Sequence, residues 1–176
     1  MFFARILRGA GFEVNVLFGA ENPGVEAWKR IPQAQFNLVV SPWVGIKNAE
    51  HLQKKYNQPY LHIPEIPVGE EATAKFIRQV VEYAGIDKAQ SEQFIRQEAD
   101  IYYYYLEHFS EFFAEYWYGM PSEFVVTADA AYKKGALFFE VATPSSETLV
   151  INRSHIGYRG ALQFLERIYS ASVGGR

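Results

Sequence analysis

The stretch from Phe36 to Thr73 decides the fold. It opens as Phe36-Asn-Leu-Val-Val-Ser-Pro-Trp-Val-Gly45, and after a polar segment it closes as Pro59-Tyr-Leu-His-Ile-Pro-Glu-Ile-Pro-Val-Gly-Glu-Glu-Ala-Thr73. The two short apolar runs, 36–40 and 60–63, predict strands, and residues 46–56 between them predict a helix with a charged outer face. Because strands joined by a helical crossover of about a dozen residues lie parallel, this stretch predicts a parallel sheet.

The sequence before and directly after this stretch predicts more elements of an α/β unit. The expected elements are a helix over Phe2–Arg8 ended by Gly9 and Gly11, a strand over Glu13–Phe18, a short helix over Val25–Ile31 stopped by Pro32, and a helix over Gly69–Ala84. The last of these carries Ala72, Phe76, Val80 and Tyr83 at helical spacing, which predicts a buried face. Helices alternate with strands, as in an open α/β sheet.

A long aromatic helix is predicted next, capped by Asp87 or Ser91 and running to Tyr118. Apolar residues recur along it at steps of three and four, which predicts a packing stripe, and we take them as interface candidates: Tyr102, Leu106, Phe109, Phe113 and Tyr116. The remaining sequence predicts a strand over Glu123–Ala128, a helix from Asp129 to about Val141, a strand over Leu149–Ile151 and a helix over Ile156–Ser170.

These elements predict an α/β protein of the flavodoxin- or Rossmann-like three-layer type, with an open parallel sheet flanked by helices. We expect four parts: an α/β domain over 1–86, the long connecting helix over 87–119, a partial second α/β unit over 120–173 that packs on the first, and a disordered tail over 174–176.

Composition narrows the functional classes. The 176 residues carry a net charge of −3 and no basic run longer than two, so nucleic-acid binding is not expected. No apolar run approaches the roughly 18 residues of a membrane span, and the N-terminal apolar stretch is too short for a signal peptide, so we expect a cytoplasmic protein that does not enter a membrane. The absence of cysteine excludes disulfides and any cluster held by this chain's own thiolates.

Ligands of open parallel sheets bind beyond the carboxyl ends of the strands, which directs attention to the loops there. The candidate cleft residues are Ser41, Trp43, Gly45, Glu65, Gly69, Thr73 and Asp129. Trp43 could stack on a ligand or serve a plain interface or core role, and Asp129 could face a ligand or cap a helix. Glu65 stands between Pro64 and Pro67, which hold it rigidly in its loop.

Several of these segments together resemble a known family, the nitrogenase component 1-type oxidoreductases. The resemblance covers nearly the whole chain, and its order is more specific than any single motif. The segments are Val14-Asn-Val-Leu-Phe-Gly19, Trp28-Lys-Arg-Ile-Pro32, Asn37-Leu-Val-Val-Ser-Pro-Trp-Val-Gly45, Gln58-Pro-Tyr-Leu-His-Ile-Pro64, Pro67-Val-Gly69, Phe124-Val-Val-Thr-Ala-Asp129 and Asn152-Arg-Ser-His-Ile-Gly-Tyr-Arg-Gly-Ala-Leu162. They are similar to the middle domain and part of the third domain of a β-like subunit, or of a less studied paralogue.

The resemblance implies an oxidoreductase lineage in which full-length relatives hold an iron–sulfur or metal cluster. It also implies a homo- or hetero-oligomer with a nitrogenase-like subunit, and a possible reductase partner. In cofactor-carrying subunits of the family a histidine directly precedes the glycine that matches Gly157, whereas here Ile156 does and His155 lies one place earlier. The other cofactor ligand is a cysteine, which this sequence lacks, so no metal ligand is assigned.

We therefore expect a fragment or natural short form of such a subunit, which supplies scaffold and cleft wall rather than cluster ligands and is inactive when isolated. Two alternatives stay open: a non-enzymatic scaffold that dimerises through its aromatic helix, and a flavodoxin-like binder of small ligands.

Overall fold

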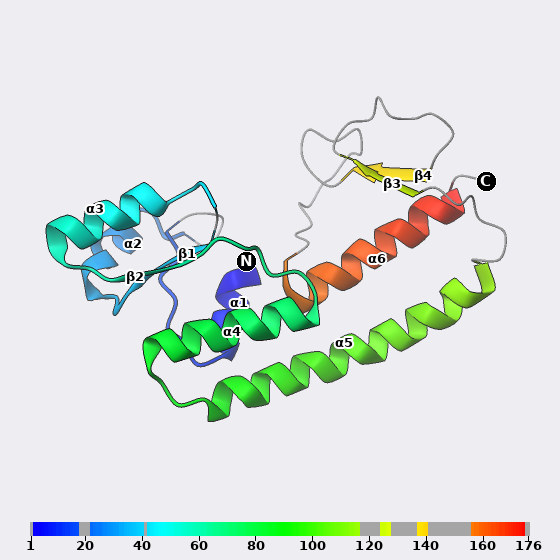
Figure 1. Ribbon diagram of the computed structural model, residues 1–176, viewed down its shortest axis with the longest axis horizontal. Helices are drawn as coiled ribbons and strands as arrows, with labels where there is room; N and C mark the ends of the chain where they lie inside the picture. The colour runs from blue at the N-terminus through cyan, green and yellow to red at the C-terminus, as the bar shows by residue number, and fades with distance from the viewer. Residues whose placement is uncertain are drawn as a thin grey trace.

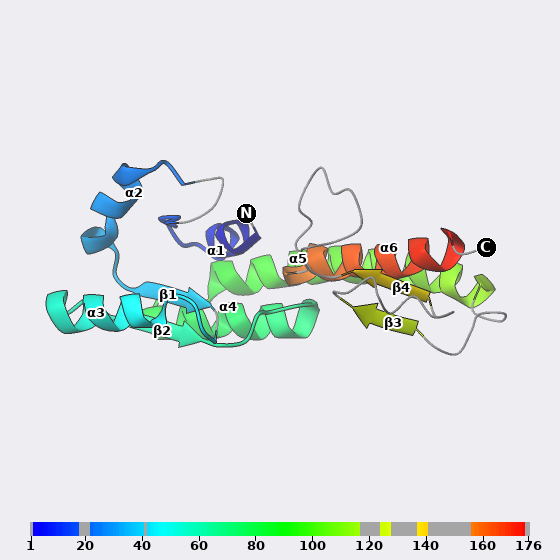
Figure 2. The same ribbon diagram turned by 90° about the horizontal axis from the view of Figure 1, so that it is seen from above.

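The computed structural model describes residues 2–17, 22–40, 42–116, 124–127, 137–140 and 156–174. Its elements, in chain order, are α1 (Phe2–Gly9), α2 (Val25–Lys29), the 3₁₀ helix η1 (Ile31–Gln33), β1 (Asn37–Val40), α3 (Ile46–Tyr56), β2 (Tyr60–Ile63), α4 (Glu70–Ala84), α5 (Ala89–Tyr116), β3 (Phe124–Thr127), β4 (Leu137–Glu140) and α6 (Gly157–Gly174). Figure 1 shows an elongated molecule with β1 and β2 near one end and β3 and β4 near the other. Figure 2, which turns this view by 90°, shows the same separation of the two strand pairs.

The stretch that decides the fold has the predicted structure. β1 and β2 pair in parallel, with Asn37 opposite Tyr60 and Val40 opposite Ile63, and α3 makes the crossover between them. α3 follows Gly45, whose φ of 91° lies in the left-handed region that favours glycine. It ends at Asn57, also left-handed, whose backbone N–H donates to the Gln53 carbonyl. The parallel α/β class is confirmed.

The core lies where α4 packs against α1, α5, α6 and β2. Ile6, Phe76, Ile77 and Val80 are almost fully buried there, and Tyr158 joins them from α6. The buried face of α4 is broader than predicted: it consists of Thr73, Ala74, Phe76, Ile77, Val80 and Val81. Phe76 and Val80 were predicted correctly, but Ala72 and Tyr83 are exposed because they lie at the two edges of that face.

The long helix is confirmed as α5, with 28 residues and a length of about 42 Å at about 1.5 Å per residue. The Asp87 side chain accepts a hydrogen bond of 3.2 Å from the Ala89 backbone N–H, so Asp87 provides the cap. Figure 1 shows α4 along the first half of α5 and α6 along its second half. α5 thus joins the two ends of the molecule. Within the part of the chain that is described, no helix is apolar enough over sufficient length to cross a bilayer.

The strand predicted over Glu13–Phe18 was wrong for its described part, since residues 13–17 form no strand. Alternation in this segment has another cause: Val14 packs on the core, while the exposed Glu13 pairs with Arg30 at 2.7 Å. Asn15 donates its side-chain amide to the Ala27 carbonyl at 2.8 Å. Such side-chain contacts tie an extended segment down without a backbone ladder.

The predicted strand at 123–128 is confirmed as β3, but the helix expected from Asp129 to Val141 was wrong where it is described. Residues Leu137–Glu140 form β4, which pairs in parallel with β3, Phe124 lying opposite Leu137. A Leu-Phe-Phe run favours a strand, and a neighbouring strand overrides the helix signal. Leu149–Ile151 lies outside the described residues. α6 runs past the predicted Ser170 to Gly174, and residues 175 and 176 are not described. The domain boundaries stay predictions.

Candidate site at the carboxyl ends of β1 and β2

Two loops leave the same edge of the first sheet, because parallel pairing places Val40 and Ile63 side by side. The first loop leads to α3 and contains Trp43, which is 84% exposed, and the exposed Val44. The second loop leads to α4 and contains the exposed Ile66 and Val68. Large apolar side chains that reach solvent from two adjacent loops are typical of a binding surface rather than of a finished exterior.

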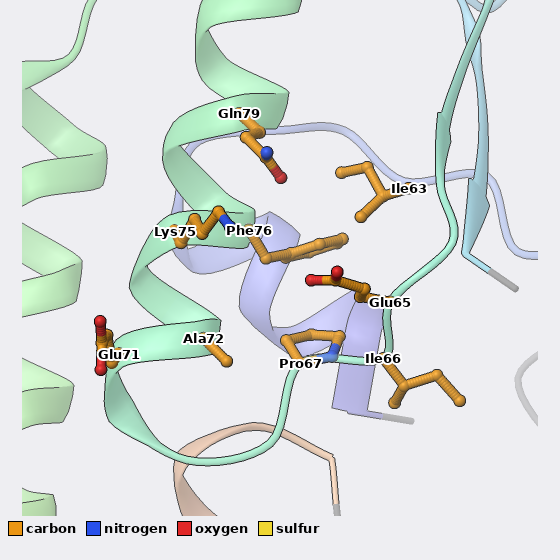
Figure 3. A pocket seen from close by; sticks show the side chains of 9 residues that line it. All are labelled: Ile63, Glu65, Ile66, Pro67, Glu71, Ala72, Lys75, Phe76 and Gln79. Carbon is orange, nitrogen blue, oxygen red and sulfur yellow. The ribbon is translucent and has the colours of Figure 1, made fainter.

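A pocket of about 230 Å³ opens beside the second loop, between β2 and α4 (Figure 3). Apolar side chains surround it together with several polar groups, and the complete lining is Ile63, Glu65, Ile66, Pro67, Glu71, Ala72, Lys75, Phe76 and Gln79. In Figure 3 the Glu65 carboxylate points toward the ring of Phe76, whereas Glu71 lies on the far side of α4. The pocket therefore combines an apolar wall with one inward carboxylate, a combination suited to orienting a small ligand.

The start of α6 holds the second loop in place. The backbone N–H of Gly157 donates to the Pro67 carbonyl at 2.8 Å, and the N–H of Gly69 donates to the Gly157 carbonyl at 3.4 Å. Val68 and Gly157 form an isolated parallel bridge. Gly157 has a φ of +76°, and a Cβ there would lie 2.9 Å from Cδ1 of Ile6. Only glycine fits this close approach without displacement, so a residue far along the chain positions residues 67–69.

The predicted cleft residues do not all meet at this pocket. Glu65 lines it, Trp43 and Gly45 belong to the other loop, and Gly69 precedes α4. Thr73 is fully buried and its hydroxyl donates to the Gly69 carbonyl, so it fixes the start of α4 instead of facing a ligand. Ser41 and Asp129 lie outside the described residues.

The interface candidates divide in the same way. Tyr102 is half-buried, with its ring centroid 6.3 Å from that of Tyr158 on α6, and Leu106 is half-buried as well. Phe109, Phe113 and Tyr116 belong to α5, but their side chains are not among those described. The part of the stripe that is described therefore turns toward the protein's own helices.

Charged pairs link α5 to the helices that carry the site. Arg5 donates two hydrogen bonds of 2.8 and 2.6 Å to the buried Glu98, and the bond from Arg5, opposed by burial, lowers the pKa of the Glu98 carboxyl. Arg78 on α4 bonds to Glu92 at the surface and lowers the pKa of that carboxyl too. Burial raises the pKa of the Tyr158 hydroxyl well above its usual range, and its oxygen has no hydrogen-bond partner among the described residues.

The described residues do not fit a metal cluster. They contain no group of three or more histidine, aspartate or glutamate side chains that could hold a metal ion, and the whole sequence has no cysteine. Iron–sulfur clusters are held chiefly by cysteine thiolates. We therefore assign no cluster ligand.

Sequence reasoning missed Lys75 and Gln79 as pocket residues. Both lie on α4, and they follow Ala72 and Phe76 by three residues each. That spacing places all four on neighbouring strips of one helix surface, so the polar flank of the apolar stripe was the available signal. Tyr158 was noted only as part of a glycine-rich helix start, and its aromatic ring beside the long helix could have indicated core packing.

The fold and the pocket define an α/β protein with a ligand-sized hollow at the carboxyl edge of a parallel sheet. Residues 3–115 match the family described as "Nitrogenase component 1 type Oxidoreductase". Since that match covers more than half of the sequence, the chain belongs to this family. The matched region contains α1 through most of α5, and hence β1, β2 and the pocket.

The relatives found carry one name, that of the second of the lettered subunits of light-independent protochlorophyllide reductase. The chain is 38% identical over 97 residues to the relative from Synechocystis sp., which is 53% of this chain and 18% of the relative. It is 28% identical over 160 residues to the relative from Angiopteris evecta, which is 89% of this chain and 29% of the relative. The chain thus spans less than a third of the relatives' length. No solved structure matches significantly.

Proposed function

We propose that this chain supplies scaffold and cleft wall to a nitrogenase component 1-like oxidoreductase subunit, with cluster ligands coming from other polypeptide. The observation that carries the proposal is the pocket beside β2, which lies within the family match and has Glu65 pointing inward. Its relatives are named as subunits of a light-independent protochlorophyllide reductase, which favours a reductase that works without light.

The rigidity of this region supports the scaffold role. Pro67 and Gly69 are tied to Gly157, Thr73 is tied to Gly69, and Phe76 is buried beneath the pocket. A wall held by backbone hydrogen bonds from two helices keeps its polar groups in place, which binding sites require. Under this proposal Glu65 orients a bound molecule and Trp43 covers it or stacks on a partner. The partner is a further nitrogenase-like subunit, and a reductase component delivers electrons.

A chimera tests the proposal. Residues 3–115 would replace the matching segment of the Synechocystis sp. relative, and both complex assembly and light-independent protochlorophyllide reduction would be measured. We expect the chimera to assemble and to retain reduction. Glu65→Gln should lower reduction without changing assembly, while Glu26→Gln on the distant α2 should change neither. An assembled chimera whose activity is insensitive to Glu65→Gln would overturn the cleft-wall role, and a soluble chimera that fails to assemble would overturn the scaffold role.

The pocket also favours a second candidate, a small-ligand binder of flavodoxin-like architecture. Its volume of about 230 Å³ lies below the roughly 300–1,000 Å³ of common ligand sites, so it fits part of a flavin, nucleotide or phosphosugar and not the whole of one. A thermal-shift screen of this chain with those three classes tests this candidate. Binding would raise the melting temperature in wild type and less in Glu65→Gln, whereas no shift with any of them would contradict it.

A further inference from the structure

The outer face of α5 is the largest surface feature that the proposed function leaves unused. We define it by five residues that share one side of the helix and are all exposed: Gln97, Asp100, Ile101, Tyr104 and His108. The opposite side carries the buried Ile95 and Glu98 and the half-buried Tyr102, which pack on the rest of the protein. In Figure 1 α5 forms the lower border of the molecule, with α4 and α6 above it and no described element below.

Large aromatic surface is concentrated on and beside this face. Tyr104 is 57% exposed, Ile101 is 43% exposed, and Tyr105 beside them is half exposed. Single exposed apolar side chains need no explanation, but several neighbours on one helix indicate a surface that is covered in the working state. The ring of Tyr104 already lies 4.4 Å from the ring of His108, tilted by 37°. This contact restricts both side chains in advance and so lowers the entropy cost of burying them.

The distribution of charge identifies what covers this face. Asp100 lies one helical turn before Tyr104, and His108 lies one turn after it. In an antiparallel pair of α5 helices centred on Tyr104, Asp100 of each copy faces His108 of the other. The same register sets Glu107 against Ile101. A parallel pair would instead place Asp100 against Asp100 and Glu107 against Glu107, which costs free energy through repulsion of like charges.

We propose that the outer face of α5 binds a second copy of this chain, as an antiparallel, two-fold symmetric helix pair centred on Tyr104. Tyr104 of both copies stacks at the axis, and the His108 imidazole N–H donates to the Asp100 carboxylate on either side. A two-fold contact uses the same patch on both copies, so this one face is sufficient. The surface differs from the predicted interface stripe, because Tyr102 of that stripe contacts Tyr158 of the same chain. The proposal does not depend on the reaction.

A symmetric charge swap gives the first test. Sedimentation of the purified chain at micromolar concentration should show a dimer. Asp100→His sets histidine against histidine and His108→Asp sets aspartate against aspartate, so each should raise the dissociation constant about tenfold, the effect of losing one charge-assisted contact. The double variant restores both pairs in reversed order and should recover most of the affinity. A wild-type chain that sediments as a monomer, or a double variant as weak as the single ones, would overturn the proposal.

Cross-linking tests the register directly, because the sequence has no cysteine of its own. Tyr104→Cys places one thiol from each copy at the two-fold axis, within the roughly 4 Å between Cβ atoms that a disulfide needs. Mild oxidation should then trap a covalent dimer rapidly. Tyr56→Cys on α3 is the matched control, since Tyr56 is 61% exposed against 57% for Tyr104. Equal cross-linking of the two variants would show random collision and contradict the proposed pairing.

Discussion

Arg5 on α1 donates two parallel hydrogen bonds to Glu98 on α5, at 2.8 and 2.6 Å. The Glu98 side chain is 9% exposed and the Arg5 side chain 34%, so the carboxylate is enclosed while part of the guanidinium reaches water. The Arg5 guanidinium also lies 6.0 Å from the centre of the Phe94 ring. A two-bond pair of this kind fixes orientation as well as distance, so it sets how the first helix lies across the long one.

Removal of the Glu98 charge should therefore destabilise the chain. Glu98→Gln leaves the partly buried guanidinium without its anion, and we expect a loss of about 2 kcal/mol in the free energy of unfolding. Chemical denaturation measures it. The control is Glu92→Gln, which removes the more exposed pair with Arg78 and should cost less than about 1 kcal/mol. Equal losses in both variants would show that burial of Glu98 adds nothing.

The same carboxyl predicts a pH dependence. The pKa of Glu98 is lower in the folded chain than in the unfolded one, mainly because Arg5 bonds to its charged form. Its contribution to stability is therefore complete above the unfolded value of about 4.3 and is lost as the pH falls through the folded value. Denaturation midpoints measured from pH 6 downward should fall more steeply in wild type than in Glu98→Gln. Parallel curves would contradict this assignment.

Gly157 predicts a close-contact effect. Gly157→Ala must adopt a left-handed φ and bring its Cβ to 2.9 Å from Cδ1 of Ile6, so we expect a loss of about 2–3 kcal/mol in unfolding free energy. Gly24→Ala is the control, because Gly24 has a similar φ of 79° with open space around it, and it should cost only about 1 kcal/mol.

The clash itself can be isolated. Ile6→Val removes the Cδ1 atom that the new Cβ would meet, so the double variant with Gly157→Ala should be more stable than the sum of the single losses indicates. Strict additivity would show that the contact with Ile6 carries no part of the effect.

Tyr158 predicts a substitution that does not destabilise. Its ring is almost fully buried against Tyr102, and its hydroxyl has no hydrogen-bond partner among the described groups. Tyr158→Phe keeps the ring and removes a buried polar group, so the unfolding free energy should stay equal or rise by about 1 kcal/mol. Tyr158→Ala should lose about 3–5 kcal/mol through the cavity that it leaves. A clear loss in the phenylalanine variant would reveal a hydrogen bond to the hydroxyl.

Local sequence signals predicted the first α/β unit well, because the chain there follows its own propensities. Pro59 and Pro64 bracket β2, and Gly45 and Asn57 bracket α3, so the boundaries of these elements are fixed by residues with restricted backbone angles. Where structure depends on distant partners, the sequence was insufficient. Residues 13–17 alternate like a strand but lack one to pair with, and Leu137–Glu140 becomes a strand beside β3.

The site was predictable in location but not in membership. Parallel strands place their carboxyl ends together, which correctly directed attention to Glu65. Lys75 and Gln79 come from the side of α4, and no strand-end rule includes them. Thr73 stands at the right place in sequence, but its hydroxyl bonds to Gly69 and not outward. The rotation of a helix about its axis decides such cases, and packing sets that rotation.

The central claim is that this chain forms wall and scaffold while other polypeptide holds the cluster. Iron and acid-labile sulfide should be measured in the chain purified to homogeneity under strictly anaerobic conditions. We predict far less than one iron per chain, because the sequence offers no thiolate. Stoichiometric iron and sulfide bound to this chain alone would contradict the claim.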